Sequence, residues 1–453
     1  MAYRGAEQIG RTALGPRPLP PLGPPCVPSA PPVLDTVLES GLRIIAVRRP
    51  AVPMVELRLK IPFGGTERTH PARAELLAMT LLQGTPRRDR FAIDKALAAV
   101  GGDLSAGVDP EHLSISGVAL ACGLDVVLEV LGDALTSAAY VTAEVERERD
   151  RLLERLAVNR STPRVIAREA LQRCRYGDHP FAREWPEAHD VAAVSAAALR
   201  ELHHRAVVPG GAVLVLVGDI VPERAVAAVA SALAGWWAEH LATELAVLPE
   251  LTGAQLQLVH RDNAVQSQLR LSAQALPRNH ERYPALQVAN LVFGGYFSSR
   301  WMENVREAKG YTYSAHCGFE FTRHGATLIA SADTASEVTA LTLLETRYEL
   351  GRIAVMAPEE SEVDNARQYA IGSLTIATAS QRGLATSLAT LATVGLDLHW
   401  LLTQPDRLRA VTIGQVAEAA AEFLAPTRFT GVIVGNAKRL TDPLAALGGV
   451  TLP

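Results

Sequence analysis

The sequence has few cysteines and no long apolar run. Its four cysteines, in 453 residues, lie far apart and form no Cys-x-x-Cys pair, which argues against a disulfide framework and favours a reducing compartment. No apolar run reaches the roughly 18 residues that a membrane-spanning helix needs. The N-terminal residues also lack the apolar core of a secretory signal. We therefore expect a cytoplasmic protein without a membrane span.

Lysine is scarce as well, because nearly all positive charge comes from arginine and lysine occurs at only four positions. The net charge is −4, whereas a nucleic-acid-binding protein normally presents a strongly basic face. The glycine-rich motifs of nucleotide binding and the GxSxG motif of serine hydrolases are also missing. We expect no nucleic-acid partner. The wealth of alanine and arginine is typical of a GC-rich bacterial genome.

The sequence does show a globular chain that is too long for one hydrophobic core. Residues 1–32 are rich in proline and are predicted to form a flexible arm. Apolar patterns then predict one order of strands and helices twice, over 33–237 and 254–453, joined by a linker at 238–253. We predict an α+β fold of two homologous domains, each an antiparallel sheet packed against helices.

Several motifs in both halves resemble those of the pitrilysin/insulinase family of metallopeptidases, in particular its mitochondrial-processing branch. The resemblance spans about 33–445. The motifs are Gly64-Gly65-Thr66-Glu67, Leu81 to Thr85, Gly101 to Ala106, Val217-Gly218-Asp219, Phe293 to Arg300, and Val305 to Tyr313. Membership would imply that the two homologous domains form half of a clamshell chamber.

The resemblance also locates a zinc motif whose ligands are replaced. Active members carry H-x-x-E-H on the first helix, with two histidines on one face and a glutamate as general base. The corresponding positions here are Glu75, Ala78 and Met79. The third ligand, a glutamate on a later helix, aligns with Arg155, or with Glu154 if the alignment is one residue out. A catalytic zinc takes three protein ligands, so we predict no metal in this chain, although Glu75 could help to hold one.

The second half retains another part of the family's site. The family uses an arginine and a tyrosine to hold the substrate and stabilise the tetrahedral intermediate, and these match Arg306 and Tyr313. Spacing alone has ordinary interpretations, since an arginine near a helix C-terminus complements the helix dipole and a tyrosine packs well on a strand. Ser299 and Arg300, in the same motif, are expected to cap the start of their helix.

Other candidate ligands are better explained as structural residues. His203-His204 are neighbours on a helix and point about 100° apart, so they cannot share a metal. His316 and Glu320 share one face of a strand, but no third ligand is evident. Trp236-Trp237 are expected to pack in the core or linker, with an interface as the alternative.

The resemblance implies a non-catalytic subunit of a heteromeric zinc metallopeptidase. Arg306 and Tyr313 would complement a zinc-bearing homologous subunit, in a heterodimer or heterotetramer that cleaves peptides. Zinc is expected in that partner and no cofactor in this chain. The alternative is a structural protein, like the core subunits of respiratory complexes that share this family's fold. A self-sufficient metallopeptidase would need zinc ligands that the sequence does not show.

Overall fold

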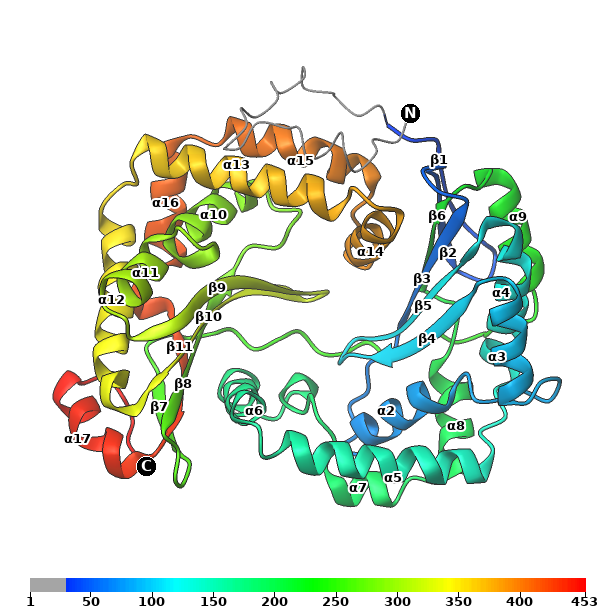
Figure 1. Cartoon of the computed structure of the whole chain (residues 1–453), viewed down its shortest axis with the longest axis horizontal. Helices are drawn as coiled ribbons and strands as arrows, with labels where there is room; N and C mark the ends of the chain where they lie inside the picture. The colour runs from blue at the N-terminus through cyan, green and yellow to red at the C-terminus, as the bar shows by residue number, and fades with distance from the viewer. Residues whose placement is uncertain (1–29) are drawn as a thin grey trace, which may run out of the picture. The chain divides into compact units, whose positions relative to one another are not determined.

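A computed structural model describes residues 30–453. All but the last three residues of the predicted arm, 1–32, lie outside the described residues. The chain forms two mixed sheets packed against helices (Figure 1), which confirms the predicted α+β class. The predicted linker, 238–253, contains neither helix nor strand, and its Leu245 is buried.

The first sheet has the strand order β1-β2-β6-β3-β5-β4, and all its neighbours are antiparallel except β2 and β6. Its strands are β1 (Val33–Val37), β2 (Arg43–Arg48), β3 (Met54–Pro62), β4 (Asp103–Val108), β5 (His112–Leu120) and β6 (Val213–Gly218). The helices of this half are α2 (His70–Thr80), α3 (Arg90–Ala99), α4 (Leu124–Ser137), α5 (Thr142–Asn159), α6 (Pro163–Tyr176), α7 (Ala188–Ala192), α8 (Ala196–Ala206) and α9 (Pro222–Ala232).

The second sheet has the order β7-β11-β8-β10-β9, with β7 and β11 parallel. Its strands are β7 (Leu256–His260), β8 (Gln266–Ala275), β9 (Thr312–Thr322), β10 (Gly325–Ala335) and β11 (Thr430–Gly435). The helices are α10 (Tyr283–Asn290), α11 (Arg300–Met302), α12 (Thr339–Val355), α13 (Glu360–Ala377), α14 (Gln381–Ala392), α15 (Leu398–Ala410), α16 (Ile413–Phe423) and α17 (Ala437–Leu447). Apart from β1, the two sheets share one topology, as expected of homologous domains.

The parallel pair in each sheet departs from the purely antiparallel sheets that the patterns suggest. In both halves the last strand returns after a long helical stretch, and such a crossover permits parallel pairing. Three helices, α7, α15 and α17, are absent from the predicted pattern; α7 has only five residues, and Pro405 and Pro443 lie inside α15 and α17. The helix expected to begin at Ser299 and Arg300 is a short α11 followed by a π-helical segment, Glu303–Ala308.

The central strands β6 and β11 are buried along their whole length. In β6, Leu214 and Leu216 face the core of the first half, while the alternate valines contact Leu388 and other residues of α14. In β11, Val432 and Val434 contact Ala167 and Leu171 of α6. Each half therefore covers the second face of the other half's sheet with one helix, which explains why both strands read as continuous apolar runs.

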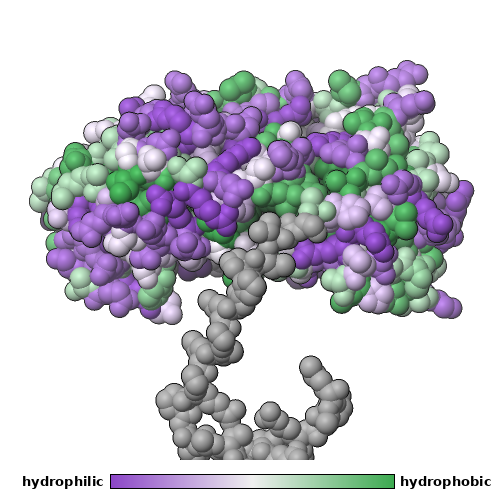
Figure 2. Space-filling view, turned by 90° about the horizontal axis from the view of Figure 1, so that it is seen from above, coloured by the Kyte–Doolittle hydropathy of each residue, from purple (hydrophilic) through white to green (hydrophobic). Residues whose placement is uncertain are grey.

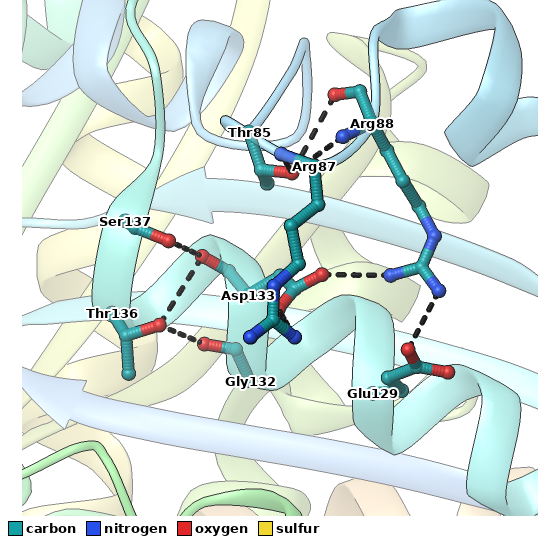
Figure 3. Close-up of polar contacts among 8 residues, drawn as sticks. All are labelled: Thr85, Arg87, Arg88, Glu129, Gly132, Asp133, Thr136 and Ser137. Atoms are coloured by element: carbon teal, nitrogen blue, oxygen red, sulfur yellow. Dashed lines mark hydrogen bonds and ion pairs between the residues drawn. The ribbon is translucent and has the colours of Figure 1, made fainter.

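The chain after α2 is fixed by a small polar cluster on α4 (Figure 3). Thr85 Oγ1 accepts hydrogen bonds from the backbone N–H groups of Arg87 and Arg88, at 3.3 and 3.1 Å. The Arg88 guanidinium donates to Asp133 and Glu129, both at 2.7 Å. This turn fixes the C-terminal end of α2, the helix that carries the altered zinc motif.

The described surface is largely hydrophilic in the view from above, with hydrophobic residues in patches (Figure 2). Within residues 30–453, no single helix is both long and apolar enough to cross a membrane. A pair of segments, 121–137 and 142–159, bent by 93° at the break between them, meets the length and composition criteria together.

A buried ion pair joins α6 to the second sheet. Arg175, whose side chain is fully buried, donates to Glu320 Oε2 on β9 at 2.6 Å and to Ser272 and Thr327 at 3.2 and 3.1 Å. Arg168 also donates to Glu320. Burial alone would raise the pKa of Glu320, but the two guanidinium groups outweigh it and the pKa is lowered.

Replacing Glu320 with glutamine should destabilise the fold, because Arg175 would remain buried without a counter-charge. We expect a loss of roughly 2 kcal/mol at pH 7, below the 3–5 kcal/mol typical of fully buried pairs because Glu320 keeps some solvent contact. Urea unfolding of the natural chain and of the variant measures this loss of unfolding free energy. Because the folded pKa is lowered, the difference should shrink as the pH falls below the ordinary value of 4.5.

Glu337→Gln is the matched control, since Glu337 forms an exposed pair with Arg439. It should change stability by less than about 0.5 kcal/mol. Equal losses in the two variants would contradict a structural role for the buried pair.

Candidate functional site

The positions aligned with the zinc motif meet α5 in the structure. Glu75 and Met79 lie four residues apart on α2 and therefore share one face. Arg155 reaches both from α5: its Nη2 lies 2.5 Å from Glu75 Oε1 and 3.5 Å from Met79 Sδ. Glu154, the alternative third position, is exposed and makes no hydrogen bond or ion pair within the described chain. A guanidinium thus lies between the two positions that hold histidines in active members.

These residues do not fit a zinc ion. Arg155 is a permanent cation, Met79 offers only a soft thioether, and Ala78 is buried in the core without a proton-accepting group. Burial raises the pKa of Glu75, and Arg155 offsets that effect in part. Over residues 30–453, no group of three or more His, Cys, Asp and Glu side chains could hold a metal ion.

The altered site still borders a cavity of about 340 Å³. Glu75 and Arg155 line it together with Trp185 and with Val108, the last residue of the edge strand β4. The cavity wall thus carries the ion pair between Glu75 and Arg155.

Arg306 and Tyr313 lie together in the second half. The Arg306 guanidinium carbon is 5.0 Å from the centroid of the Tyr313 ring and 4.6 Å from that of Phe297. Tyr313 is 84% exposed and Phe297 is 59% exposed, so the guanidinium sits between two aromatic faces at the surface. Arg306 also forms an ion pair with its neighbour Glu307, with 3.4 Å between Arg306 Nε and Glu307 Oε1. The arrangement presents a guanidinium and a phenol side by side as hydrogen-bond donors.

Two irregular stretches of backbone, a π-helical segment and a β-bulge, position Arg306 and Tyr313. Arg306 lies in the π-helical segment Glu303–Ala308, and the chain turns after it at Gly310, whose φ of +67° favours glycine. Tyr313 lies where β9 pairs irregularly with β10, because the register shifts between Ala332 and Thr334. Thr312 Oγ1 stabilises that bulge by donating to the carbonyl of Asp333 at 2.6 Å. A bulge re-aims the side chains beside it, and here Tyr313 points to solvent.

The helix before Arg306 is anchored in the core by Trp301. Its ring stacks on Phe293 at 5.3 Å, and its Nε1 donates to Thr346 at 3.0 Å. Gly294 permits this packing, since a Cβ there would lie 2.9 Å from the Trp301 ring. Arg306 follows this anchor on the last part of the segment, and its side chain is half-buried.

The expectation that Ser299 and Arg300 cap this helix is wrong. Ser299 occupies the N-cap position, but its hydroxyl makes no capping hydrogen bond. Arg300 instead forms a two-bonded ion pair with Glu362 on α13, at 2.6 and 2.5 Å. Its guanidinium fits the planar carboxylate, so its contribution is to hold the segment against α13.

The remaining candidates have structural contacts. His203 is buried, with Nδ1 2.8 Å from the Tyr140 hydroxyl and Nε2 2.9 Å from the Leu135 carbonyl. Trp236 is buried and donates to the Val207 carbonyl, while its neighbour Trp237 is exposed. Glu320, considered with His316, is engaged by the arginines of α6.

Phe297 is the site residue that sequence reasoning missed. It lies in the most specific of the family motifs, but the pattern gives no sign that its ring faces Arg306 across a turn. An aromatic residue nine positions before an arginine carries no periodic signal, because the two lie on different segments. The only usable hint is that Phe297 follows Gly294-Gly295, where regular helical burial ends.

The position of Arg155 can be tested by rebuilding the ligand set. The variant Glu75→His/Met79→His keeps Arg155 and should bind no zinc, because the guanidinium remains between the two histidines. Adding Arg155→Glu should yield about one zinc per chain, since three ligands then converge. Metal analysis after dialysis against trace zinc measures both. Zinc binding by the first variant would instead indicate Glu154 as the third position.

Comparison with known proteins matches both halves. The model described as insulinase (peptidase family M16) matches residues 43–186, and that described as peptidase M16 inactive domain matches 193–369. An uncharacterized zinc protease of Mycobacterium tuberculosis is 28% identical over 312 residues, which are 66% of this chain and 69% of the relative. Human cytochrome b-c1 complex subunit 1 is 25% identical over 272 residues, 58% of this chain and 55% of that one.

The fold is shared with a crystal structure of a peptidase M16 inactive domain from Pseudomonas fluorescens. The TM-score is 0.82 at 23% identity, over 89% of this chain and 98% of the other. Models of one family thus match both halves of the chain. The chain belongs to the insulinase (peptidase M16) family, as a member whose zinc-motif positions no longer carry metal ligands.

Proposed function

We propose that this chain is the non-catalytic subunit of a heteromeric zinc metallopeptidase. The observation that carries the proposal is the contrast between the two parts of the family's site. An arginine occupies the metal position on α2 and α5, whereas Arg306 and Tyr313 lie together at the surface. A homologous subunit would carry the zinc, in a cytoplasmic heterodimer or heterotetramer, and the substrate would be a peptide.

The pair would act on the carbonyl of the scissile peptide bond. Arg306 and Tyr313 both donate hydrogen bonds, and the carbonyl oxygen gains negative charge as the tetrahedral intermediate forms. The Phe297 ring also contacts the Arg306 guanidinium, at 4.6 Å from its carbon to the ring centroid, and would help to hold it in place. The partner's zinc would polarise the same carbonyl and activate the attacking water.

A structural role is the second candidate, and the similarity to cytochrome b-c1 complex subunit 1 favours it. A scaffold needs the apolar cores and the anchor around Trp301, but it gains little from an exposed cation–aromatic contact. Such contacts contribute about 0.5–1 kcal/mol at exposed sites. The two functions therefore differ in whether Arg306 and Tyr313 matter once the assembly has formed.

Arg306→Ala and Tyr313→Phe should each lower kcat of the reconstituted peptidase about 100- to 1000-fold, as loss of an oxyanion donor does. The assay mixes this chain with a zinc-bearing homologous subunit and follows cleavage of a fluorogenic peptide. Complex formation, measured by analytical ultracentrifugation, should not change. Phe297→Ala should lower kcat less, because it removes a support and leaves both donors in place.

Arg439→Ala and Tyr348→Phe are matched controls, since both residues are exposed and neither is a hydrogen-bond, ion-pair or ring-contact partner of Arg306 or Tyr313 within residues 30–453. Each should keep full activity. A complex that forms normally and cleaves equally well with Arg306→Ala would refute the catalytic contribution and favour the scaffold.

A further inference from the structure

Helix α12, at the outside of the second half (Figure 1), carries exposed apolar side chains along one face. The four residues of this apolar stripe, which are between 44% and 82% exposed, are Leu341, Leu344, Tyr348 and Val355. At 100° per residue they fall within about 60° of one another around the helix axis, and they extend over about 21 Å of helix. The opposite face is buried, with Leu350 in the core. Single exposed apolar residues are common, whereas a contiguous apolar patch marks an interaction surface.

The equivalent helix of the first half shows that the fold does not require this stripe. In both halves a strand leads through a three-residue 3₁₀ turn into a helix, α4 or α12, so the two helices correspond from their first residues. The positions of Leu344 and Tyr348 are occupied on α4 by Glu129 and Asp133. Both of these carboxylates accept hydrogen bonds from Arg88 (Figure 3). Polar residues serve at these positions in one half, so the apolar residues of α12 call for another explanation.

The stripe is complementary to itself in an antiparallel arrangement. When a second copy of α12 lies antiparallel against the first, with Tyr348 on the twofold axis, Leu341 of each copy meets Val355 of the other. Leu344 then meets the aliphatic part of Arg352, because opposed residues lie equally far from the axis in the two directions. The same residues serve in both copies, as a twofold interface requires.

Charges beside the stripe match in this arrangement. The Arg352 side chain is 40% exposed and pairs with Glu349 at 3.5 Å. Glu345 accepts a hydrogen bond from Asn304 at 3.0 Å and lies 3.5 Å from Lys309 Nζ. In the antiparallel pair, Arg352 of each copy comes beside Glu345 of the other, so opposite charges meet twice. A parallel pair would instead bring each of these charges beside its own copy, and like charges repel.

We propose that the apolar stripe of α12 binds the same stripe of a second copy of this chain, antiparallel and around a twofold axis at Tyr348. Within residues 30–453, none of its four residues is a hydrogen-bond, ion-pair or ring-contact partner of Arg306 or Tyr313. In the assembly proposed above, the contact joins two heterodimers and favours a heterotetramer. That consequence rests on the proposed function, whereas self-association of this chain does not.

Sedimentation equilibrium of the full chain alone tests the inference. One helix pair buries less than the roughly 1,200 Å² of a stable interface, so we expect a monomer–dimer equilibrium with a dissociation constant on the order of 100 µM. The double variant Leu344→Glu/Tyr348→Asp gives α12 the residues that α4 has at these positions. It should weaken dimerisation at least about tenfold, because like charges then meet around the axis.

The matched control is Phe91→Glu/Val158→Asp, which adds the same two charges at strongly exposed apolar residues of the first half. It should dimerise as the natural chain does. Tyr348→Phe keeps the ring on the twofold axis and should also dimerise normally.

Cysteine cross-linking tests the direction of the helices. Under mild oxidation Tyr348→Cys should form more disulfide-linked dimer than the natural chain, because the two copies of this position meet on the axis. Leu341→Cys should not, since its two copies lie about 21 Å apart along the helices and a disulfide needs Cα atoms within about 7 Å.

A chain that stays monomeric up to about 500 µM would overturn the inference, as would a dimer that Leu344→Glu/Tyr348→Asp leaves unchanged. Equal cross-linking of Tyr348→Cys and Leu341→Cys would contradict the antiparallel arrangement. If the natural chain does not self-associate but needs Leu344 and Tyr348 to bind the zinc-bearing subunit, the stripe belongs to that contact and the inference is wrong. Each of these results is compatible with full dependence of the reconstituted peptidase on Arg306, and a chain without a peptidase partner could still dimerise, so the two proposals can fail separately.

Discussion

The exchange of helices between the two halves is the constraint on which the structure depends. The second face of the first sheet is covered by α14, and that of the second sheet by α6. Neither sheet could keep its central strand as a continuous apolar run without the helix from the other half. The ion pair between Arg175 of α6 and Glu320 of β9 stabilises one of these contacts. It joins the first half to β9, the strand that also carries Tyr313.

The residues that build the fold are therefore different from the residues that would bind a metal. The cores, the sheet order and the helix that carries the zinc motif need only apolar side chains at the right period. Three positions on α2 and α5, those of Glu75, Met79 and Arg155, carry the side chains that would have to be ligands for a zinc ion to bind. Arg155 forms an ion pair with Glu75, so the carboxylate does not remain unpaired in a half-buried position.

The sequence could predict the features that depend on period and motif: the two α+β halves, the helix at α2, and the joint position of Glu75, Met79 and Arg155. It could not predict features set by contacts between distant segments. Proline inside α15 and α17 hid both helices, the capping expected of Ser299 gave way to the pair between Arg300 and Glu362, and Phe297 had no periodic relation to Arg306. The parallel pairing of β6 with β2, and of β11 with β7, could not be predicted either. The direction of pairing depends on how the intervening helices return the chain to the sheet.

The geometry around Arg306 is unusual for a residue that serves only stability. A π-helical segment and a β-bulge both weaken regular hydrogen bonding, and π-helical turns occur frequently at functional sites. Here they place a guanidinium between two exposed rings, where the contact adds little to folding. Arg306 pairs only with the exposed Glu307, at 3.4 Å, whereas Arg300 and Arg175 form closer ion pairs, at 2.5 and 2.6 Å, that join different segments of the fold. The side chains that gain least from the fold are thus the ones best placed to meet a ligand, which supports a role in binding a peptide carbonyl.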